Sequence, residues 1–515
     1  MTVGTDASGP SPRKAGASAG LAGAAVGLLV AGVLHTVWSR VTFPPVSVAE
    51  AVARLTPGKV ATYFIDLLQH RALPLTVAVV ALGLVGVSAG LGSLLPRVAP
   101  RVRGGSLEAA GLLSVPVYAT ALAAFRSNMS TVGLPVYGLV LASVFAASAW
   151  ATSRVYERLI APAVPHDATR RAVTSALAVG GAGLLLGWAE LGRILFPRPN
   201  PGRLALDIAD LTPASAPPAD AAFDRIPGIS PRITPIASHY VVDEEIIDPD
   251  VDPAAWHLRI GGVVDRPYQL TYDELTALPA IEQFQTLECI SNPVGGDLMS
   301  TARWTGVPLA TILERAGVRP GAVEVVSRAI GGYSDSIPIE QAMLPTTLVA
   351  IGMNGRVLPR EHGFPARLLV PGLYGMKQPK WLEGIEVVDR PYVGYWEERG
   401  WIKAAVVKTM SRIDGGGEVD GELVVAGVAF AGTRGIAKVE VTPDSGKTWD
   451  EAELEPELSG FTWRRWRLPL ALSGKGGSEI RVRATDGEGA LQVAEITPPH
   501  PSGATGYDRR LVDVS

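Results

Sequence analysis

Residues 288–297 read Glu-Cys-Ile-Ser-Asn-Pro-Val-Gly-Gly-Asp and contain Cys289, the only cysteine among 515 residues. Small, polar and glycine residues after an apolar approach are typical of a loop that brings backbone amides close to an anionic ligand. A thiolate in such a loop can bind a soft metal ion. The alternative is a small buried hydrophobic side chain, since a lone cysteine forms neither an intramolecular disulfide nor a CxxC zinc site.

The rest of the chain is divided between an apolar part and an ordinary globular part. Its length predicts roughly three structural units. The mean hydropathy is +0.23 although 19% of the residues are charged, so the apolar residues must be segregated. The net charge of −4 gives no reason to expect a nucleic-acid partner, which requires a concentrated basic face.

The N-terminal part has the composition of a membrane protein. Residues 1–15 are predicted to be a disordered tail, and 16–195 a bundle of about five transmembrane helices. Each predicted helix is an almost uncharged run long enough to cross a hydrocarbon core of ~30 Å. The five runs are 16–38, 72–95, 106–125, 133–151 and 172–192.

Basic residues in the short loops predict the orientation of the bundle. The loop at 96–105 has three arginines and the loop at 152–171 has four, whereas the loop at 126–132 has only Arg126. Since basic loops stay in the cytoplasm, the chain beyond residue 192 is expected to be extracytoplasmic. The connection at 39–71 carries four further basic residues and weakens this count.

Thr169-Arg170-Arg171 precedes the last apolar run. This arrangement is similar to an internal twin-arginine export signal, which would carry a folded domain outward. An ordinary cytoplasmic basic anchor is the equal alternative.

Three segments follow the bundle. Residues 196–235 are rich in Pro, Ala and Asp and are predicted to be a linker that does not order itself. Short strands alternate with brief helices over 236–400, which indicates an α+β domain. Regularly spaced alternating runs over 404–500 predict a small β-sandwich.

Common catalytic motifs are absent from the soluble half. It has no GxSxG, HExxH, GxGxxG after a strand, or P-loop, and it lacks the clustered cysteines of iron–sulfur proteins. These absences disfavour a hydrolase or a nicotinamide-dependent enzyme.

Several motifs, in order, resemble the sulfite oxidase family over about residues 235–510. The ECxSN loop around Cys289 and the following ARWTGVPL (302–309) look like its molybdenum-ligand segment. YSDSIP (333–338), MNGRVLPREHGFPARLLVPG (353–372) and KWL (380–382) continue the match. DSGKTW (444–449), WRRW (463–466) and RATD (483–486) look like the immunoglobulin-like dimerisation domain of these enzymes.

The resemblance implies a molybdenum atom held by one molybdopterin, with Cys289 as the protein ligand. His362, Arg367 and Lys380 match the family's cofactor contacts, and they supply donors suited to the phosphate of the pterin. Ser291, Asn292 and Ser336 are expected to hydrogen-bond the pterin edge. Trp304 is either a cofactor neighbour or a core residue. In WRRW, the aromatic residues suit any sandwich core, and Arg464 and Arg465 are expected to face solvent or a dimer partner.

Departures from the family pattern concern the substrate. The arginine that follows the cysteine in sulfite-oxidising members is absent, and Trp401 stands where those members have a tyrosine. His239 and Tyr240 occupy a segment that also lacks the family's arginine. A pocket without guanidinium groups loses its main hold on a dianion, so His239, Tyr240 and Trp401 are predicted to form a less cationic pocket for a neutral S-oxide or N-oxide.

Electrons must come from or go to a separate partner, cytochrome or quinone-linked, because no HPGG-type haem segment is present. Haem in the bundle is disfavoured, since His35 and His70 lie near segment ends. The expected architecture is therefore a transmembrane bundle, an α+β molybdopterin-binding domain and an Ig-like domain that implies a homodimer. The expected activity is two-electron oxygen-atom transfer. The alternatives are a reductase of oxidised sulfur or nitrogen compounds, and a cofactor-free membrane receptor or structural protein that retains the fold.

Overall fold

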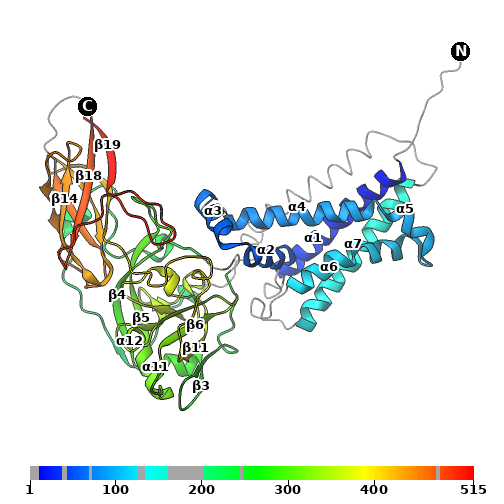
Figure 1. The fold of residues 1–515 in the computed structure, drawn as a ribbon, viewed down its shortest axis with the longest axis horizontal. Coiled ribbons are helices and arrows are strands. Elements are labelled where there is room, and N and C mark those ends of the chain that lie inside the picture. Colours follow the sequence, from blue (N-terminus) through cyan, green and yellow to red (C-terminus); the bar gives the residue numbers. More distant parts are fainter. Residues whose placement is uncertain are drawn as a thin grey trace. The chain divides into compact units, whose positions relative to one another are not determined.

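The computed structural model describes residues 11–37, 43–68, 72–124, 134–160, 201–243, 245, 248–470 and 476–514. The chain divides into two compact units, a helical unit over residues 1–199 and a sheet-rich unit over residues 200–515, apart from 245–250, which belong to the first. Figure 1 shows the helices of the first unit in blue and cyan and the strands of the second in green to red.

Four described helices of the first unit are long and apolar enough to cross a membrane. Their helical cores are α1 (Pro12–Val37), α4 (Ala72–Gly92), α6 (Gly105–Ala124) and α7 (Leu134–Ile160). Glycines allow close packing: a Cβ on Gly20 of α1 would lie 2.2 Å from the carbonyl oxygen of Ser88 in α4. Small residues are how membrane helices approach one another, so this contact fits a bilayer-embedded bundle.

The connection at 39–71 contains two helices that the sequence analysis did not predict, α2 (Pro44–Leu55) and α3 (Gly58–Leu68). The α7 helix also runs nine residues past the predicted end at 151, because its polar last turns continue the helical hydrogen bonding. Leu95–Val98 (α5) and Ala99–Arg101 (η2) continue α4 at its end. The predicted fifth span, 172–192, lies outside the described residues.

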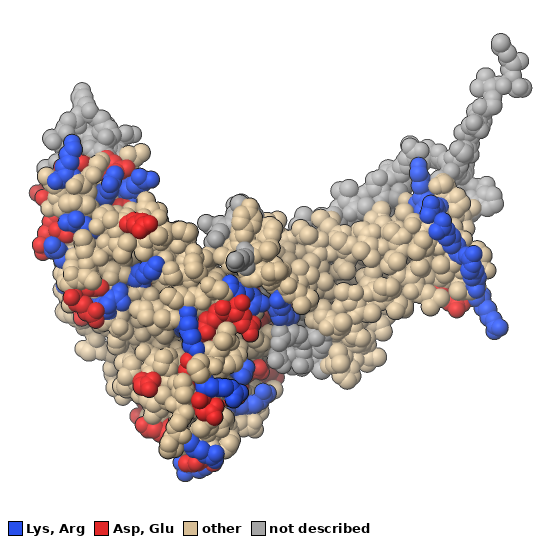
Figure 2. Space-filling view, viewed as in Figure 1, with Lys and Arg blue, Asp and Glu red and all other residues tan. Residues whose placement is uncertain are grey.

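Basic side chains gather at one end of the helical unit, near α5 (Figures 1 and 2). A buried cluster joins the start of α1, α5, the start of α6 and the end of α7, which brings these four chain segments to the same end. The basic residues on these segments are Arg13, Lys14, Arg97, Arg101, Arg103, Arg154 and Arg158. Much of the remaining surface of this unit in Figure 2 carries no charge.

Two sheets build the first part of the second unit. One has the order β1-β4-β5-β8-β10 with β9 paired to β8, and the other has the order β3-β2-β11-β6-β7. The strands of the first are β1 (Leu211–Thr212), β4 (Ala280–Glu288), β5 (Met299–Pro308), β8 (Leu348–Met353), β9 (Arg356–Val357) and β10 (Arg367–Leu369). Those of the second are β2 (His257–Gly262), β3 (Tyr268–Thr271), β6 (Glu324–Ala329), β7 (Ser334–Pro338) and β11 (Leu382–Val388).

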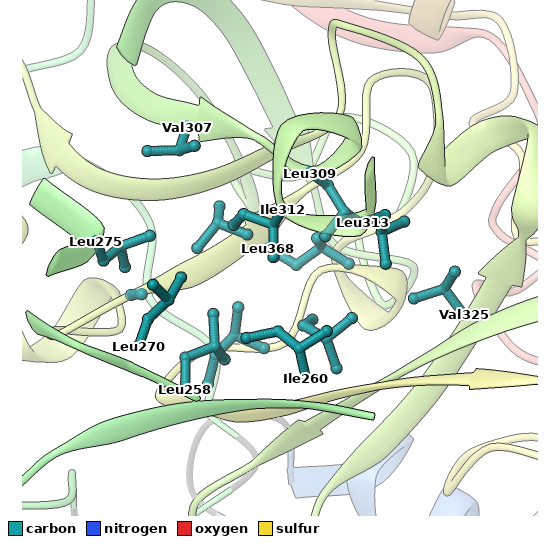
Figure 3. Packing of buried hydrophobic residues seen from close by; sticks show 14 of the residues in the cluster. Leu258, Ile260, Leu270, Leu275, Val307, Leu309, Ile312, Leu313, Val325 and Leu368 are labelled. Carbon is teal, nitrogen blue, oxygen red and sulfur yellow. The ribbon is translucent and has the colours of Figure 1, made fainter. Parts of the chain in front are cut away.

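One apolar core holds these two sheets together. Leu309, Ile312 and Leu313 of helix α11 (Leu309–Ala316) pack with Leu258 and Ile260 of β2 (Figure 3). The helix ends where Gly317 adopts φ 71°, a left-handed conformation that favours glycine and lets its N–H bond back to Leu313. Two short helices, α10 (Tyr272–Thr276) and α12 (Ile339–Ala342), each follow a strand directly. The α+β prediction for 236–400 agrees with this arrangement.

The last part of the chain is a two-sheet β-sandwich, with orders β12-β13-β17-β16 and β15-β14-β18-β19. Its core joins Val425 and Trp466 of one sheet to Val439, Val441 and Val482 of the other. The strands are β12 (Met410–Val419), β13 (Glu422–Phe430), β14 (Ile436–Thr442), β15 (Asp450–Glu451), β16 (Glu453–Leu454), β17 (Arg464–Pro469), β18 (Gly476–Asp486) and β19 (Asp508–Val514). The last strand lies beyond the predicted end at residue 500, because β19 completes the edge of β18.

The segment 201–235 differs from the predicted unordered linker. Phe223, in the short helix α9 (Ala221–Asp224), is fully buried, and Ile226 packs against Val424 and Ala426 of the sandwich. Asp224 accepts a hydrogen bond from Arg465 at 2.7 Å. Two apolar anchors and an ion pair therefore order a segment whose overall composition is polar.

Arg465 was expected at a solvent or dimer face, and this prediction is wrong. Its side chain is 1% exposed and makes a bidentate pair with Glu455 at 2.7 and 2.8 Å. Its neighbour Arg464 is half-buried and donates to the carbonyl oxygens of Glu455 and Ile436. The charge of Arg465 is tolerated in the interior because two carboxylates surround it.

Replacing Arg465 by Ala should destabilise the sandwich strongly. Removing one partner of a buried pair leaves an unpaired charge and costs roughly 3–5 kcal/mol. Arg467→Ala is the matched control, because the Arg467–Glu453 pair is partly exposed and worth at most about 1 kcal/mol. Thermal unfolding of the full chain in detergent measures both, and equal midpoints for the two variants would contradict this account.

Candidate cofactor site

The cysteine loop connects two paired strands. Glu288 at the end of β4 pairs with Met299 at the start of β5, and Cys289 follows directly, 9% exposed. The N–H of Cys289 donates to the carbonyl oxygen of Leu298 at 3.0 Å. Asn292 donates to Glu288 and accepts from the N–H of Leu298, each at 3.1 Å. These two side-chain bonds of Asn292 fix the loop, and its predicted contact with a pterin stays a prediction.

Glu288 is buried beside this loop. Burial raises the pKa of its carboxyl to about 7, and the hydrogen bond from Asn292 and the positive charge of Arg412 only partly oppose this effect. The sequence analysis included Glu288 in the motif but gave it no role. A carboxyl that takes up a proton near neutral pH is a distinctive electrostatic feature next to a thiol.

A second group of predicted residues forms an aromatic and cationic cluster. His239 follows the turn η5 (Ile236–Ser238), and His362 ends the turn η6 (Arg360–His362). Their ring centroids lie 4.9 Å apart. The His239 ring also lies 5.6 Å from Trp304 and stacks on Tyr240 at 5.5 Å. Both histidines are almost completely buried, and the structure therefore brings together residues that are far apart in the sequence.

Both imidazoles are held neutral. Burial lowers the pKa of His239 to about 3, helped by the charge of Arg367. Burial, with the neighbouring His239, Arg367 and Lys380, lowers the pKa of His362 to about 2. Among the described residues, neither Nε2 atom has a hydrogen-bond partner. Two buried ring nitrogens that face no protein partner suit a ligand that hydrogen-bonds to them.

Arg367 and Lys380 add positive charge to this cluster. Arg367 lies in β10, 6% exposed, and donates to the carbonyl oxygens of His362 and Gln378, each at 3.2 Å. Lys380, 4% exposed, donates to the carbonyl oxygen of Val242 at 3.0 Å and pairs with Asp243. Trp304 is fully buried, and the Arg367 guanidinium lies 5.3 Å from its ring. Trp304 is thus both a core residue and a neighbour of the cationic cluster.

The cysteine loop and the cationic cluster meet at Gly375, in the turn η7 (Gly375–Lys377). A Cβ at this position would lie 3.4 Å from the Tyr240 hydroxyl and 3.6 Å from the carbonyl oxygen of Glu288. The backbone N–H of Tyr240 donates to Ser300 in β5 at 3.1 Å. Tyr240 therefore lies between the histidine pair and the end of β4 that carries the cysteine.

Ser336 belongs to a separate buried polar group. Its hydroxyl donates to Glu324 at 2.7 Å, and the predicted contact with a pterin stays a prediction. The adjacent Asp335 pairs with Lys377 at 2.6 Å, and Lys377 also pairs with Glu397 at 2.5 Å. The sequence analysis missed Lys377, although a lysine three residues before the KWL motif was a visible signal.

Trp401 and Ser291 meet through a residue that the sequence analysis missed. The Ser291 hydroxyl lies 2.8 Å from Nε2 of His500. The His500 ring stacks on Trp401 at 4.4 Å, and Trp401 stacks on Trp396 at 4.1 Å. No pattern in the Pro-His-Pro segment indicated a site residue.

Two family models match the chain. The oxidoreductase molybdopterin binding domain matches residues 245–396, and the Mo-co oxidoreductase dimerisation domain matches residues 403–498. The first range contains Cys289, Trp304, His362, Arg367 and Lys380. His239 and Tyr240 lie just before it, and His500 follows the second range by two residues.

Relatives among known proteins agree with these models. Mitochondrial sulfite oxidase of Rattus norvegicus is 31% identical over 305 residues, which is 48% of this chain and 55% of that protein. The uncharacterized oxidoreductase YuiH of Bacillus subtilis is 34% identical over 150 residues, 29% of this chain and 74% of that protein. The solved sulfane dehydrogenase SoxCD of Paracoccus pantotrophus is 23% identical with a TM-score of 0.49, covering 55% of this chain and 82% of that one.

The fold, the buried thiol and these matches define a molybdopterin-binding oxidoreductase domain. The chain belongs to the sulfite oxidase family, whose cofactor is molybdenum with molybdopterin. It spans about half the length of the sulfite oxidases that it matches.

The neutral histidine pair predicts acid sensitivity. The pKa values of about 3 and 2 lie below the ordinary value of 6.5, so between these limits the unfolded chain binds more protons than the folded one. Stability from each neutral imidazole is present above pH 6.5 and is lost as the pH falls. At pH 5 the loss is about 2 kcal/mol for each histidine.

Thermal unfolding at pH 7 and pH 5 tests this expectation, in protein from cells that make no molybdopterin. A His239→Asn, His362→Asn double variant should lose less stability on acidification than the native chain. His257→Asn, in β2 at a partly exposed position, is the matched control and should behave like the native chain. Identical pH slopes for all three proteins would show that the buried pair is not the acid-sensitive element.

Proposed function

We propose that this protein is a molybdenum-dependent oxidoreductase that performs two-electron oxygen-atom transfer on a small substrate at the extracytoplasmic face of a membrane. The observation that carries the proposal is the buried Cys289 thiol at the end of β4, joined through Tyr240 to a buried cluster of two histidines, an arginine and a lysine. A thiol and a cationic cluster are what a metal and a phosphorylated pterin require.

In this proposal Cys289 supplies the one protein sulfur to molybdenum. The unpartnered Nε2 atoms of His239 and His362 hydrogen-bond the cofactor, and Arg367 and Lys380 stabilise its phosphate. Both cations already bind carbonyl oxygens, which fixes their head groups before any ligand arrives. The bound cofactor supplies the two-electron redox chemistry, while the protein orients the substrate and sets the electrostatics.

The substrate is proposed to be a neutral S-oxide or N-oxide, and the direction reduction. The charges around the cysteine loop support this choice. Arg412, the guanidinium that acts on Glu288, is engaged by Asp414 at 2.6 Å and by the carbonyl oxygen of Gly296 at 2.7 Å. Tyr240 and Trp401, which flank the loop, carry no charge. A dianion such as sulfite would gain little charge-assisted binding there.

The helical unit supports the proposed sidedness of the membrane. Four spans return the chain to the end where α1 starts, and that end carries the seven basic residues named above. Basic segments favour the cytoplasm. An extracytoplasmic catalytic unit then requires one further crossing between residues 161 and 200, for which the apolar run 172–192 is the candidate.

Further proposals concern a second copy of this chain, the electron donor and the export signal. The second family model supports a homodimer through the sandwich, for which the Ig-like fold is our proposal. A separate cytochrome or quinone-linked protein is proposed as the electron donor. The helical bundle is not proposed to bind haem. The twin-arginine segment at 169–171 is proposed as the export signal.

A Cys289→Ser change should abolish turnover while the fold persists, because serine fits the buried position but is a poor ligand for a soft metal. The measurement is molybdenum and pterin content per chain, together with methionine sulfoxide reduction by reduced viologen, on the full chain in detergent. Serine should lower the rate at least about a hundredfold, since the metal's ligand field and position change together. His257→Gln is the control. Native activity in Cys289→Ser would refute the metal-ligand role.

The proposed orientation has its own test. A tag after Ser515 should be reached by antibody on intact spheroplasts, whereas a tag before Met1 should be reached only after permeabilisation, because five crossings place the ends on opposite sides. Labelling of both tags on intact cells, or of neither, would contradict the fifth crossing.

A further inference from the structure

After β18 the chain comes back to the cysteine loop, where hydrogen bonds fix its position. The carbonyl oxygen of Gly503 accepts from the Lys408 ammonium at 2.7 Å, and that of Pro501 accepts from the N–H of Ile402 at 3.0 Å. Thr497 and Thr505 are bridged across the same segment, and their hydroxyls lie 2.8 Å apart. Residues 497–505, which we name the return segment, thus form a fixed wall.

The return segment places His500 against the cysteine loop. Its side chain is buried, and its Nε2 lies 2.8 Å from the hydroxyl of Ser291, two residues after the thiol. Trp401 and Trp396 continue the wall, with interplanar angles of 24° and 10° between successive rings. Trp396 is half-buried, so the stack runs from the cysteine loop toward the surface.

We propose that His500 is a positioning residue for the cysteine loop, and that the stack of His500, Trp401 and Trp396 makes the pocket selective for small dipolar oxides over dianions. This inference rests on the proposed function and names the substrate class of that site. A hydrogen bond to Ser291 restrains the loop that carries Cys289. An aromatic face attracts the positive end of a polarised S–O or N–O bond and offers nothing to an anion.

Two cationic groups near the stack are engaged by other parts of the protein, and a third, the Lys408 ammonium, binds the return segment itself. Lys377, in the turn that follows Tyr374, is bound by Asp335 and Glu397. Arg399 lies over the ring of Tyr395 at 3.7 Å and donates to the carbonyl oxygen of that residue. An incoming dianion therefore meets aromatic rings and cations that the protein already engages, and it loses far more hydration free energy on leaving water than an uncharged oxide does.

The reaction that this pocket would serve balances in atoms and in electrons. A sulfoxide loses its oxygen as the S–O bond breaks, two electrons and two protons are taken up, and a thioether and water are released. The electrons come from a one-electron carrier of the cytochrome class or from a quinol, and in the assay from reduced viologen.

Two substitutions separate the hydrogen bond from the stack. His500→Phe keeps a ring on Trp401 but loses the bond to Ser291, and Ser291→Ala loses the same bond from the other side. Each should lower kcat for methionine sulfoxide about tenfold with KM nearly unchanged, and the double variant should fall no further, because both remove one bond. His500→Gln can keep the bond without the ring and should chiefly raise KM.

A third substitution tests selectivity. His500→Arg introduces a guanidinium into the wall and should raise the ratio of sulfite oxidation to sulfoxide reduction at least about tenfold, since a bidentate charged contact is worth that much. His257→Gln controls for loss of a histidine elsewhere in the same unit. Molybdenum content is measured for every variant, so that rates are expressed per loaded site.

The outcomes distinguish this inference from the function on which it rests. A native chain without molybdenum or without sulfoxide turnover overturns both. A loaded, active native chain with additive losses in His500→Phe and Ser291→Ala, or with an unchanged ratio in His500→Arg, overturns the inference alone. If His500→Phe fails to fold, the other two variants still test the role of His500. A lower kcat in Ser291→Ala with kcat kept in His500→Gln supports a positioning residue, and the opposite pattern indicates that His500 only packs.

Discussion

In the proposed site, backbone geometry alone must present the Cys289 thiol to the metal, because Cys289 is the one protein ligand proposed. The antiparallel pairing of β4 and β5 meets this requirement, since the register that joins Glu288 to Met299 fixes both ends of the loop. Asn292 ties the loop to its own strand end. Farther along the same strands, the paired hydroxyls of Thr286 and Thr301 hold the ladder. The pairing of β4 with β5, two largely buried strands, therefore determines the position of Cys289.

The charges around this thiol are arranged to need a ligand. Arg367 and Lys380 are cations buried beside two imidazoles that are held neutral, and Lys380 is paired with Asp243. Burying a charge is costly even where it is paired. An anionic phosphate would relieve that cost, whereas an empty cluster retains it. On the other side of Tyr240, Glu288 has a pKa raised to about 7, so near neutral pH its carboxyl is only partly ionised and adds only part of a negative charge beside the thiol. The same burial that destabilises the empty protein would therefore favour the loaded one.

Local motifs made part of this site predictable. His362, Arg367 and Lys380 lie in motifs that resemble the sulfite oxidase family, so this resemblance predicted that they share a site, and Arg367 and Lys380 do lie close enough to His362 to lower its pKa. The contact between Ser336 and Glu324 could not be predicted, because Glu324 comes from another strand. The contact of His500 with Ser291 could not be predicted, since the two residues lie 209 positions apart in the sequence. They meet only because the chain comes back to the cysteine loop after β18, a strand of the sandwich. The burial of Arg465 was not predicted because alternation along a strand does not reveal its carboxylate partners, Glu455 just after β16 and Asp224 in α9.

The burial of the site also constrains when its cofactor can enter. His362, Arg367 and Lys380 are each at most 6% exposed, and the return segment lies fixed across the cysteine loop. A pterin bound beside these buried side chains would be enclosed by the folded unit, which favours insertion while the unit folds. The proposed cofactor is assembled inside the cell, and the proposed catalytic unit works outside it. Both proposals hold together only if the unit crosses the membrane already folded, which is the kind of transport that the arginine pair before the last apolar run would direct.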